Sequence, residues 1–479
     1  MTVRTFGHII GGEEIAAQSG KTFDVLSPST QAVIGVCADG ASEDIDAAVS
    51  SARAGFKIWS DLAPKDREAC LLKAADLVEK EGVERFLNTL MHESGSVLNK
   101  ARGEIAYTVD LLRTAAGEVR RLYGETFPND NPDRMSLVIR EPLGVVAVVS
   151  PYNAPLALLV KMAAFPLAAG NSVVIKPSEE TPMIALAFVR LLLDAGLPKN
   201  AVNIVTGFGL GTGKPLVEHE DIDAIALTGS TQTGIAVGAA GMQKMRRMQL
   251  ELGGKSALII LKDSDPHKAA KIAAQGIFTH AGQICMANSR ILVEQEILKD
   301  FLVAFKAEAE NLPIGDVESE KSFYGPLINQ AAVSKVQAHV DSAVAKGATL
   351  LTGGQLLEGL VYQPTILLET PRNCDAWREE SFAPMCSVIG VSSLDHAIEE
   401  ANDSPFGLSA AVLTQNISRG MRAAKEIKAG SVHIGMHAFQ SNALAPIGGF
   451  GMSGIGKSGG RYSTEEFTEQ KWISIEVNE

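Results

Sequence analysis

Short, almost wholly apolar runs alternate with helix-forming segments between residues 145 and 261. The runs are rich in Val, Ile and Ala and cover residues 145–150, 172–176, 202–206, 224–228 and 257–261, with helical segments at 155–169, 182–195 and 232–245. Strands without a polar face are buried on both sides, and the helices between them connect parallel neighbours. The alternation therefore predicts a parallel sheet covered by helices on both faces, with ligands bound at the carboxyl ends of its strands.

Beyond residue 290 the same alternation predicts a second α/β domain, with strands at 290–294, 365–369, 386–391, 409–414 and 431–435 and helices at 298–311, 332–346, 397–402 and 419–429. Three earlier helices are expected at 42–59, 67–79 and 102–123. An irregular stretch at 124–142 and a β-prone tail from residue 467 stand apart, and a terminal strand of this kind often pairs with another subunit. We therefore divide the chain into a first domain (1–123 and 143–250), a second domain (251–450) and a small β arm for oligomerisation (124–142 and 463–479).

The chain has 479 residues and a net charge of −13. This length exceeds what a single hydrophobic core supports, and the acidic balance argues against a nucleic-acid partner. The N-terminus lacks a signal-peptide pattern, and Lys161 and two prolines interrupt the most apolar stretch, 154–170, so no membrane partner is expected. Five widely spaced cysteines suggest neither a disulfide framework nor a metal motif. We expect a soluble, cytoplasmic protein without a metal site.

Three residues have the chemistry of a catalytic site, although each also has an ordinary structural interpretation. Cys285 follows Gly282 and Gln283 and can lie at a helix N-terminus, where the dipole lowers a thiol pKa; alternatively it is a buried core cysteine. Glu251 precedes a glycine pair that can hold its carboxylate near a site, or it is a surface residue. Asn153 ends an apolar strand and can donate to a developing oxyanion, or it lies in a proline-bounded turn.

Polar and glycine-rich exits follow the other strands. Lys176 and Glu179 can hydrogen-bond sugar hydroxyls at the end of one strand. The glycine run 207–213 and the Thr-Gly-Ser at 228–230 follow the next two, but neither matches the G-x-G-x-x-G dinucleotide fingerprint well. Singly these exits are weak indications of a ligand site, since most glycine runs are only turns.

Taken together in this order, the motifs resemble the aldehyde dehydrogenase superfamily over essentially the whole chain. The matching blocks are SPYNAP (150–155), VIKPSEETP (174–182), LTGS (227–230), ELGGK (251–255), GQICMANSR (282–290), EESFAPM (379–385), NDSPFGLSA (402–410) and GGFGMSGIG (448–456). The resemblance implies a Rossmann-like dinucleotide-binding domain, a second α/β catalytic domain and the β arm. The predicted β arm favours a homodimer or homotetramer over a monomer.

The resemblance assigns Cys285 as the nucleophile that attacks the aldehyde carbon. Its backbone N–H and Asn153 would hold the oxyanion, and Glu251 would activate the water that hydrolyses the thioester. Covalent attack turns the aldehyde into an alkoxide-like centre that expels hydride readily. The implied reaction is the NAD(P)⁺-dependent oxidation of an aldehyde to a carboxylic acid.

The family's cofactor contacts transfer to the strand exits and to the EESFAPM block. Lys176 and Glu179 would face the adenine-side ribose, and Ser230 would face the pyrophosphate. Because a carboxylate at residue 179 accepts both ribose hydroxyls and repels a 2′-phosphate, NAD⁺ is favoured over NADP⁺, with which Lys176 and Ser178 are also compatible. Glu380 and Phe382 would position the nicotinamide. The full set of implied cofactor contacts is Ser150, Lys176, Ser178, Glu179, Gly209, Ser230, Glu380 and Phe382.

The SPYNAP block, HIG at 433–435 and the chain from 459 to 475 look most like the benzaldehyde, salicylaldehyde and vanillin dehydrogenase branch, which implies aromatic aldehyde catabolism. We hypothesise that Lys161 meets a phenolate or carboxylate of an aromatic aldehyde; alternatively it extends to solvent. Compared with the common pattern, Tyr152 replaces Trp, Ala383 replaces Gly and Ile447 replaces Phe. The expected substrate contacts are Tyr152, Asn153, Lys161, Ile284, Met286 and Ile447.

Four other functions remain open at this point. An aliphatic semialdehyde dehydrogenase would use the same catalytic residues with a different basic clamp. A CoA-acylating enzyme usually lacks the glutamate found here at residue 251. A catalytically silent structural member need not keep Asn153, Glu251 and Cys285 together. A cysteine hydrolase would need a partner such as His280, for which nothing else argues.

Overall fold

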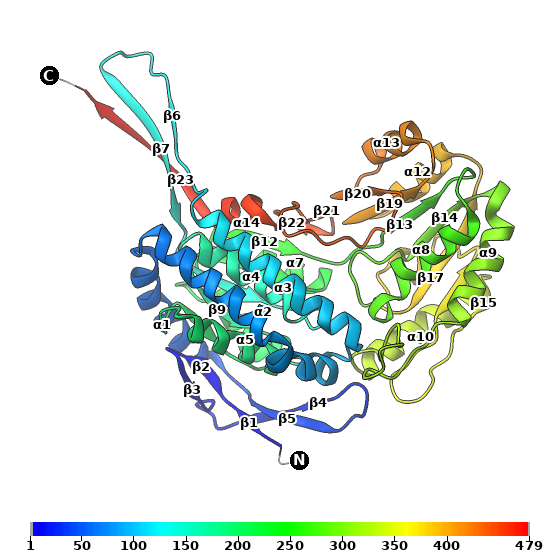
Figure 1. Ribbon diagram of the computed structural model, residues 1–479, viewed down its shortest axis with the longest axis horizontal. Coiled ribbons are helices and arrows are strands. Elements are labelled where there is room, and N and C mark those ends of the chain that lie inside the picture. The colour runs from blue at the N-terminus through cyan, green and yellow to red at the C-terminus, as the bar shows by residue number, and fades with distance from the viewer. Residues whose placement is uncertain (1–2, 478–479) are drawn as a thin grey trace.

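A computed structural model describes residues 3–477, in which two α/β halves lie side by side and a thin β arm projects from the first (Figure 1). The larger sheet has the strand order β22-β12-β11-β8-β9-β10-β2-β3. Its central strands are mutually parallel, and the edge strands β22, β2 and β3 are antiparallel. The strands are β2 (His8–Ile10), β3 (Glu13–Ile15), β8 (Val145–Val149), β9 (Ser172–Lys176), β10 (Val202–Ile204), β11 (Ala224–Thr228), β12 (Arg247–Glu251) and β22 (Gly454–Ile455).

Helices cover both faces of this sheet, as the sequence predicts. Alternate residues of β8 enter two different cores: Val145 and Ala147 pack with one set of helices, Val146 and Val148 with the other. The first set is α1 (Ser42–Ser60), α6 (Lys214–Glu218) and α7 (Thr231–Met242). The second is α2 (Pro64–Ser94), α3 (Leu98–Val119), α4 (Ala157–Ala168) and α5 (Pro182–Ala195). The apolar strands are therefore buried on both faces.

Two elements of the first half differ from expectation. Helix α2 continues to Ser94 instead of ending at residue 79. Gly82 lies within it, at a close helix contact where a Cβ would come within 2.8 Å of Ile105, so the glycine serves packing and does not end the helix. Strand β12 was not predicted, since Arg247 and Gln249 make it look polar. Gln249 is nevertheless buried, and its amide donates to the Lys457 carbonyl oxygen at 2.6 Å. Strand β12 carries Glu251 as its last residue.

The second half is built on a sheet of order β15-β16-β17-β14-β13-β19-β20, parallel except for its edge strand β15. The chain crosses from the first sheet to the second through residues 252–256. Its strands are β13 (Ala257–Ile260), β14 (Arg290–Glu294), β15 (Thr349–Thr352), β16 (Thr365–Leu368), β17 (Met385–Val391), β19 (Ser409–Leu413) and β20 (Ser431–Ile434). Its helices are α8 (Pro266–Phe278), α9 (Gln295–Glu310), α10 (Gln330–Ala345), α11 (Asp375–Arg378), α12 (Leu394–Asn402) and α13 (Ile417–Glu426). The predicted second α/β unit is thus present.

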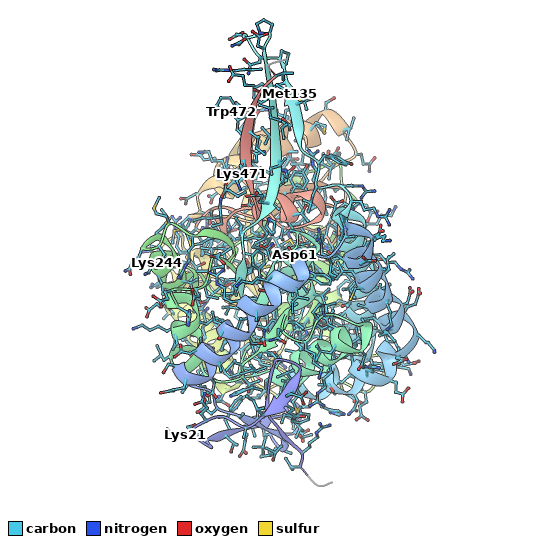
Figure 2. All side chains as sticks on the ribbon, turned by 90° about the vertical axis from the view of Figure 1, so that its left-hand side faces the viewer. Lys21, Asp61, Met135, Lys244, Lys471 and Trp472 are labelled. Carbon is cyan, nitrogen blue, oxygen red and sulfur yellow. The ribbon has the colours of Figure 1, made fainter. Side chains whose placement is uncertain are left out.

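The arm combines the two segments that stood apart in the sequence. Strand β23 (Thr468–Glu476) pairs antiparallel with β7 (Arg134–Pro142) along its whole length, and β6 (Glu125–Phe127) covers the other edge of β7. Met135 and Trp472 lie on the part that projects beyond the body of the molecule (Figure 2). Trp472 is 64% exposed, so the arm presents apolar surface to its surroundings.

Smaller elements complete the described chain. They are β1 (Thr5–Phe6), β4 (Thr22–Leu26) and β5 (Val33–Ala38), which form one sheet, β18 (Phe406–Gly407) with β21 (Phe450–Gly451), and α14 (Gly460–Glu466) at the base of the arm. Within residues 3–477, every helix is too short or too polar to span a bilayer.

Asn171 ties three segments of the first half together. Its buried amide oxygen accepts from Gly144 N at 2.9 Å, and its amide nitrogen donates to the carbonyl oxygens of Pro166 at 3.0 Å and Phe467 at 2.9 Å. We expect Asn171→Ala to destabilise the protein by about 2–5 kcal/mol, because buried backbone groups lose their partners. Thermal unfolding measures this as a lower Tm. The matched control is Asn311→Ala at the exposed end of α9, which should change stability by less than about 0.5 kcal/mol.

Candidate active site

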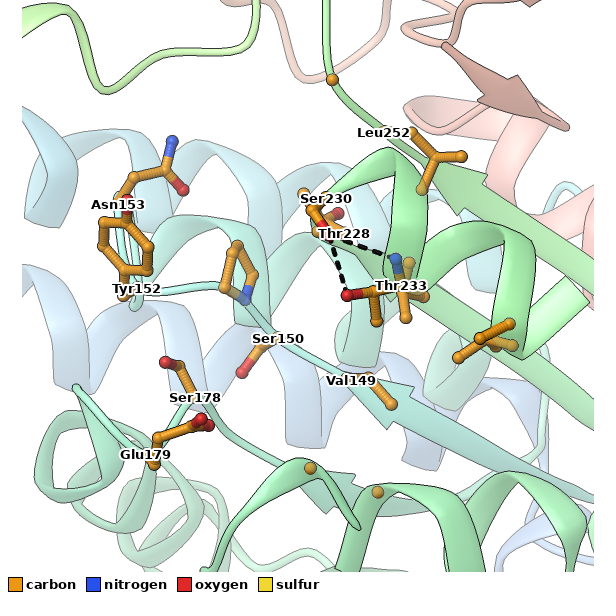
Figure 3. A pocket seen from close by; sticks show the side chains of 18 of the residues that line it. Val149, Ser150, Tyr152, Asn153, Ser178, Glu179, Thr228, Ser230, Thr233 and Leu252 are labelled. Carbon is orange, nitrogen blue, oxygen red and sulfur yellow. Dashed lines mark hydrogen bonds between the residues drawn. The ribbon is translucent and has the colours of Figure 1, made fainter. Parts of the chain in front are cut away.

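The carboxyl ends of β8, β9 and β11 open into a cavity of about 890 Å³ between the two halves. Figure 3 shows polar side chains from all three strand exits around it. All eight residues expected to contact a cofactor line this cavity together with Tyr152, Asn153 and Cys285. These are Ser150, Lys176, Ser178, Glu179, Gly209, Ser230, Glu380 and Phe382. The structure therefore brings motifs that are far apart in the sequence to one groove.

The groove suits a dinucleotide in size and in its polar groups. Ser230 caps α7, accepting a hydrogen bond from Thr233 N at 3.1 Å (Figure 3), and the N-terminus of a helix favours phosphate. Glu179 offers a carboxylate for ribose hydroxyls and is held by Lys176, whose Nζ lies 3.0 Å away. The N-terminus of a helix and the Lys176–Glu179 pair thus line the same cavity as Cys285.

Cys285 lies in a turn between the Thr279–Gly282 segment and β14, so the expectation of a helix N-terminus is wrong. The expected lowering of the thiol pKa is wrong as well. Burial, together with the charges of Glu380 and Glu251, raises the pKa of Cys285 to about 12, and Lys161 offsets this only in part. The thiol is half-buried and protonated at neutral pH.

The backbone before this turn has an unusual conformation. His280, Ala281 and Gly282 are all left-handed, with φ of 51°, 55° and 69°. Such angles are strained for residues with a Cβ. A Cβ at Gly282 would also lie 2.1 Å from the Ala383 carbonyl oxygen, so only glycine fits there. These left-handed residues reverse the direction of the chain between α8 and the cysteine turn.

Asn153 connects the first half to this turn. Its Nδ2 donates to the Gln283 carbonyl oxygen at 2.8 Å, and the side chain is buried. Gln283 is itself fixed, since its side chain bonds the backbone of His280, Pro326 and Ile328. An amide nitrogen has two hydrogens, so Asn153 keeps a second N–H for a group bound beside Cys285.

Glu251 lies outside the groove lining and forms an ion pair with Lys161. The Lys161 Nζ is 3.0 Å from Glu251 Oε1, and the two side chains are 3% and 9% exposed. The alternative that Lys161 extends to solvent is therefore wrong. The ammonium of Lys161, within α4, instead forms a buried hydrogen bond with the carboxylate of Glu251.

Glu380 is a second carboxylate near the thiol. Burial raises its pKa to about 7, opposed by a bond from Gly254 N at 3.1 Å and by the charges of Lys335 and Lys255. Sequence reasoning missed both lysines. Lys255 belongs to the ELGGK block, yet nothing in the pattern indicates that its Nζ would be fully buried without a hydrogen-bond partner among the described residues. Lys335 comes from α10, which no motif marks.

The remaining predicted substrate contacts are spread around the turn. Ile284 and Met286 flank Cys285 directly. The Tyr152 and Phe382 ring centroids lie 5.9 Å apart, with the ring planes nearly perpendicular. Phe382 is held at a left-handed φ of 52°. Ile447 is half-buried in a loop that bridges to Ser458, with Ile447 N donating to the Ser458 carbonyl oxygen at 2.8 Å. The structure therefore brings Tyr152 and Asn153 to the groove and leaves Ile447 on the loop.

A second cavity of about 560 Å³ lies between α3 and the loop that leads to Ile447. It was not predicted. Tyr107 lines it, and the Tyr107 hydroxyl is buried without a partner among the described residues. Burial and the charges of Glu251 and Asp110 raise the pKa of Tyr107 to about 12. Residues 3–477 contain no cluster of three or more His, Cys, Asp or Glu side chains arranged to hold a metal ion.

The comparison with known proteins gives the class directly. The chain belongs to the aldehyde dehydrogenase family, whose model matches residues 15–473. It is 35% identical to a vanillin dehydrogenase of Pseudomonas fluorescens (98% of this chain, 97% of the relative) and 34% identical to a glutarate-semialdehyde dehydrogenase of Pseudomonas putida strain KT2440 (98% and 97%). A crystal structure of an NAD-dependent aldehyde dehydrogenase from Sinorhizobium meliloti superposes with a TM-score of 0.97 at 32% identity, covering 99% of this chain and 95% of that one.

These comparisons confirm the predicted family, the fold and the enzyme class, an NAD(P)⁺-dependent aldehyde dehydrogenase. Aromatic-aldehyde and semialdehyde enzymes are both represented among relatives of nearly equal identity.

The raised thiol pKa has a measurable consequence. Alkylation of Cys285 by iodoacetamide, followed by mass spectrometry of its peptide without added ligand, should accelerate continuously from pH 6 to pH 10, because only the thiolate reacts. Glu380→Gln should speed alkylation at pH 8 by removing a nearby negative charge. Glu379→Gln, a neighbouring carboxylate that is 63% exposed, serves as the control and should leave the rate unchanged. A rate that levels off below pH 8 would contradict the assigned electrostatics.

Proposed function

We propose that Cys285 attacks an aldehyde carbon and that the chain oxidises the aldehyde to a carboxylic acid through a thioester. The observation that carries this proposal is the bond from Asn153 Nδ2 to the Gln283 carbonyl oxygen. It keeps the remaining amide N–H close to the cysteine turn, where charge develops on the aldehyde oxygen. A donor aimed at a developing oxyanion in a dry site is worth roughly 10²–10³ in kcat.

The residues of the groove fit the binding of NAD(P)⁺, which supplies a hydride acceptor when bound. Ser230 and the α7 N-terminus would hold its phosphates, and Lys176, Ser178 and Glu179 its adenine-side ribose. We propose NAD⁺ as the preferred form, because the Glu179 carboxylate disfavours a 2′-phosphate, while Lys176 and Ser178 remain compatible with NADP⁺. Ser150, Gly209, Glu380 and Phe382 complete the proposed contacts.

Glu251 is the proposed base for hydrolysis of the thioester. It is buried, it ends a strand that neighbours the groove, and its charge acts on the Cys285 thiol. Its bond to Lys161 restricts the carboxylate to one side of the turn. A carboxylate in this position favours water over CoA as the acyl acceptor, because it can take the proton of attacking water.

For the substrate we propose an aromatic aldehyde that enters through the cavity beside α3. Tyr107 gives this cavity an aromatic wall with an unpartnered hydroxyl, and Lys161 adds a buried cation near the reacting turn. An aliphatic semialdehyde is the second candidate, because Arg113 and Arg121 also line the cavity and would suit a carboxylate. The relatives include enzymes of both kinds.

We further propose that the arm mediates a homodimer or homotetramer. Its support is the exposed apolar surface of β23 and β7, including Trp472. The proposed domain limits are those of the sequence analysis. Glu251, which opens the second domain in that division, is the last residue of β12 in the first sheet and so lies on the boundary itself.

The two chemical steps can be separated by one substitution. We expect Glu251→Gln to give a stoichiometric burst of NADH absorbance at 340 nm and a steady-state rate lower by roughly 10²-fold or more, because acylation precedes the base-dependent step. Cys285→Ala should give neither burst nor turnover. Loss of the burst in Glu251→Gln would mean that this carboxylate acts before hydride transfer.

The substrate class can be tested on Lys161. We expect Lys161→Met to lower kcat/KM for benzaldehydes that carry a phenolate or carboxylate by about 10-fold more than for neutral benzaldehydes, the size of one charge-assisted contact. A panel of aromatic and aliphatic aldehydes with NAD⁺ and NADP⁺ provides the measurement. Equal losses on charged and neutral substrates would mean that Lys161 acts only by holding Glu251 and does not contact the substrate. A preference for aliphatic acid-aldehydes would favour the semialdehyde function.

A further inference from the structure

An ion pair on α3 contacts the backbone of Asn153; the Glu104 side chain is 3% exposed and that of Lys100 16%. Lys100 Nζ donates to the Asn153 carbonyl oxygen at 2.8 Å, to Glu104 Oε2 at 2.6 Å and to Ser96 Oγ at 2.9 Å. All three hydrogens of the ammonium are therefore used, and one of them holds the backbone of the residue proposed to stabilise the oxyanion.

The other carboxylate oxygen of Glu104 binds the start of α4. Its Oε1 accepts from Leu156 N at 2.8 Å and from Ala157 N at 3.0 Å, which are the first free amides of α4. A carboxylate at a helix N-terminus is favoured by both hydrogen bonding and the helix dipole. Glu104 thus fixes the start of α4, while its second oxygen orients Lys100 toward Asn153.

His280 is a further buried group near this ion pair. Burial and the charge of Lys100 lower the pKa of His280 well below its usual range. Neither Lys100, Glu104 nor His280 lines the groove. Their closest contact with the proposed site is the hydrogen bond from Lys100 to the Asn153 carbonyl oxygen.

We propose that Lys100 and Glu104 are positioning residues that set the direction of the Asn153 amide. This inference rests on the proposed oxyanion role of Asn153. Without the ion pair, the segment from Asn153 to Ala157 would lose three hydrogen bonds and could rotate about its backbone. A displacement of about 1 Å at a reacting centre can cost roughly 10²-fold in rate.

A double-mutant cycle on the NADH burst tests the proposal in the full-length enzyme. Lys100→Met is made alone and in an Asn153→Ala background, and the burst rate constant is measured by stopped flow. We expect Asn153→Ala to slow the burst by roughly 10²-fold and Lys100→Met by roughly 10-fold or more. In the Asn153→Ala background, Lys100→Met should change the rate by less than about 2-fold, because its effect passes through the missing amide.

Two further variants keep the test informative if Lys100→Met folds poorly. Glu104→Gln retains an oxygen for the α4 amides but turns an N–H toward Lys100, so it should slow the burst without lowering the affinity for NAD⁺. Lys100→Arg keeps the charge and should recover part of the rate. The matched control is Arg102→Met on the same helix, whose exposed pair with Glu320 should be dispensable.

The outcomes separate this inference from the proposed function. Equal losses from Lys100→Met in both backgrounds would overturn positioning and leave a purely structural ion pair. An unchanged burst in Asn153→Ala would overturn the oxyanion role and, with it, the inference. A weaker affinity for NAD⁺ in Glu104→Gln, measured by fluorescence titration, would also overturn it, because the pair would then act on the groove.

Discussion

One hydrogen bond, from Asn153 Nδ2 to the Gln283 carbonyl oxygen, joins the two halves of the molecule at the point where the chemistry is proposed. Asn153 follows a strand of the first sheet, while Gln283 precedes the cysteine turn of the second half. The connection between the sheets passes under the same turn. A Cβ at Gly254 would lie 2.3 Å from the Cys285 carbonyl oxygen. The two halves are therefore held together directly at the proposed reaction site, where small errors in distance have large effects on rate.

The electrostatics of the turn follow from this closeness. Burial raises the pKa of the Cys285 thiol, and the charges of Glu380 and Glu251 raise it further, to about 12, so the thiolate is disfavoured at neutral pH. A protonated thiol is a poor nucleophile and a poor target for oxidants. Burial also raises the pKa of Glu380, to about 7. The turn thus holds the proposed nucleophile near a carboxyl group, that of Glu380, whose pKa lies close to physiological pH.

The fold and the groove were largely predictable because both follow from short-range patterns. Apolar strands specify a parallel sheet, and polar exits such as Ser150, Glu179 and Ser230 must then gather at one edge. The conformation of the cysteine turn was not predictable, since no local pattern indicates three successive left-handed residues at 280–282. The contact of Lys100 with Asn153 spans 53 positions in the sequence and depends on how α3 packs against α4. Such contacts have no local signal.

Two ion pairs contact helix α4. Its face toward the sheet is apolar, yet Lys161 within it pairs with Glu251, and Glu104 with Lys100 holds its first turn. Removing one partner of a buried pair leaves an uncompensated charge, at about 3–5 kcal/mol, so each pair persists once formed. The Lys100–Glu104 pair constrains Asn153, which precedes α4. The bond from Lys161 constrains the Glu251 carboxylate. The proposed oxyanion donor and the proposed base are therefore both tied by ion pairs to helix α4, which restrains the distance between them.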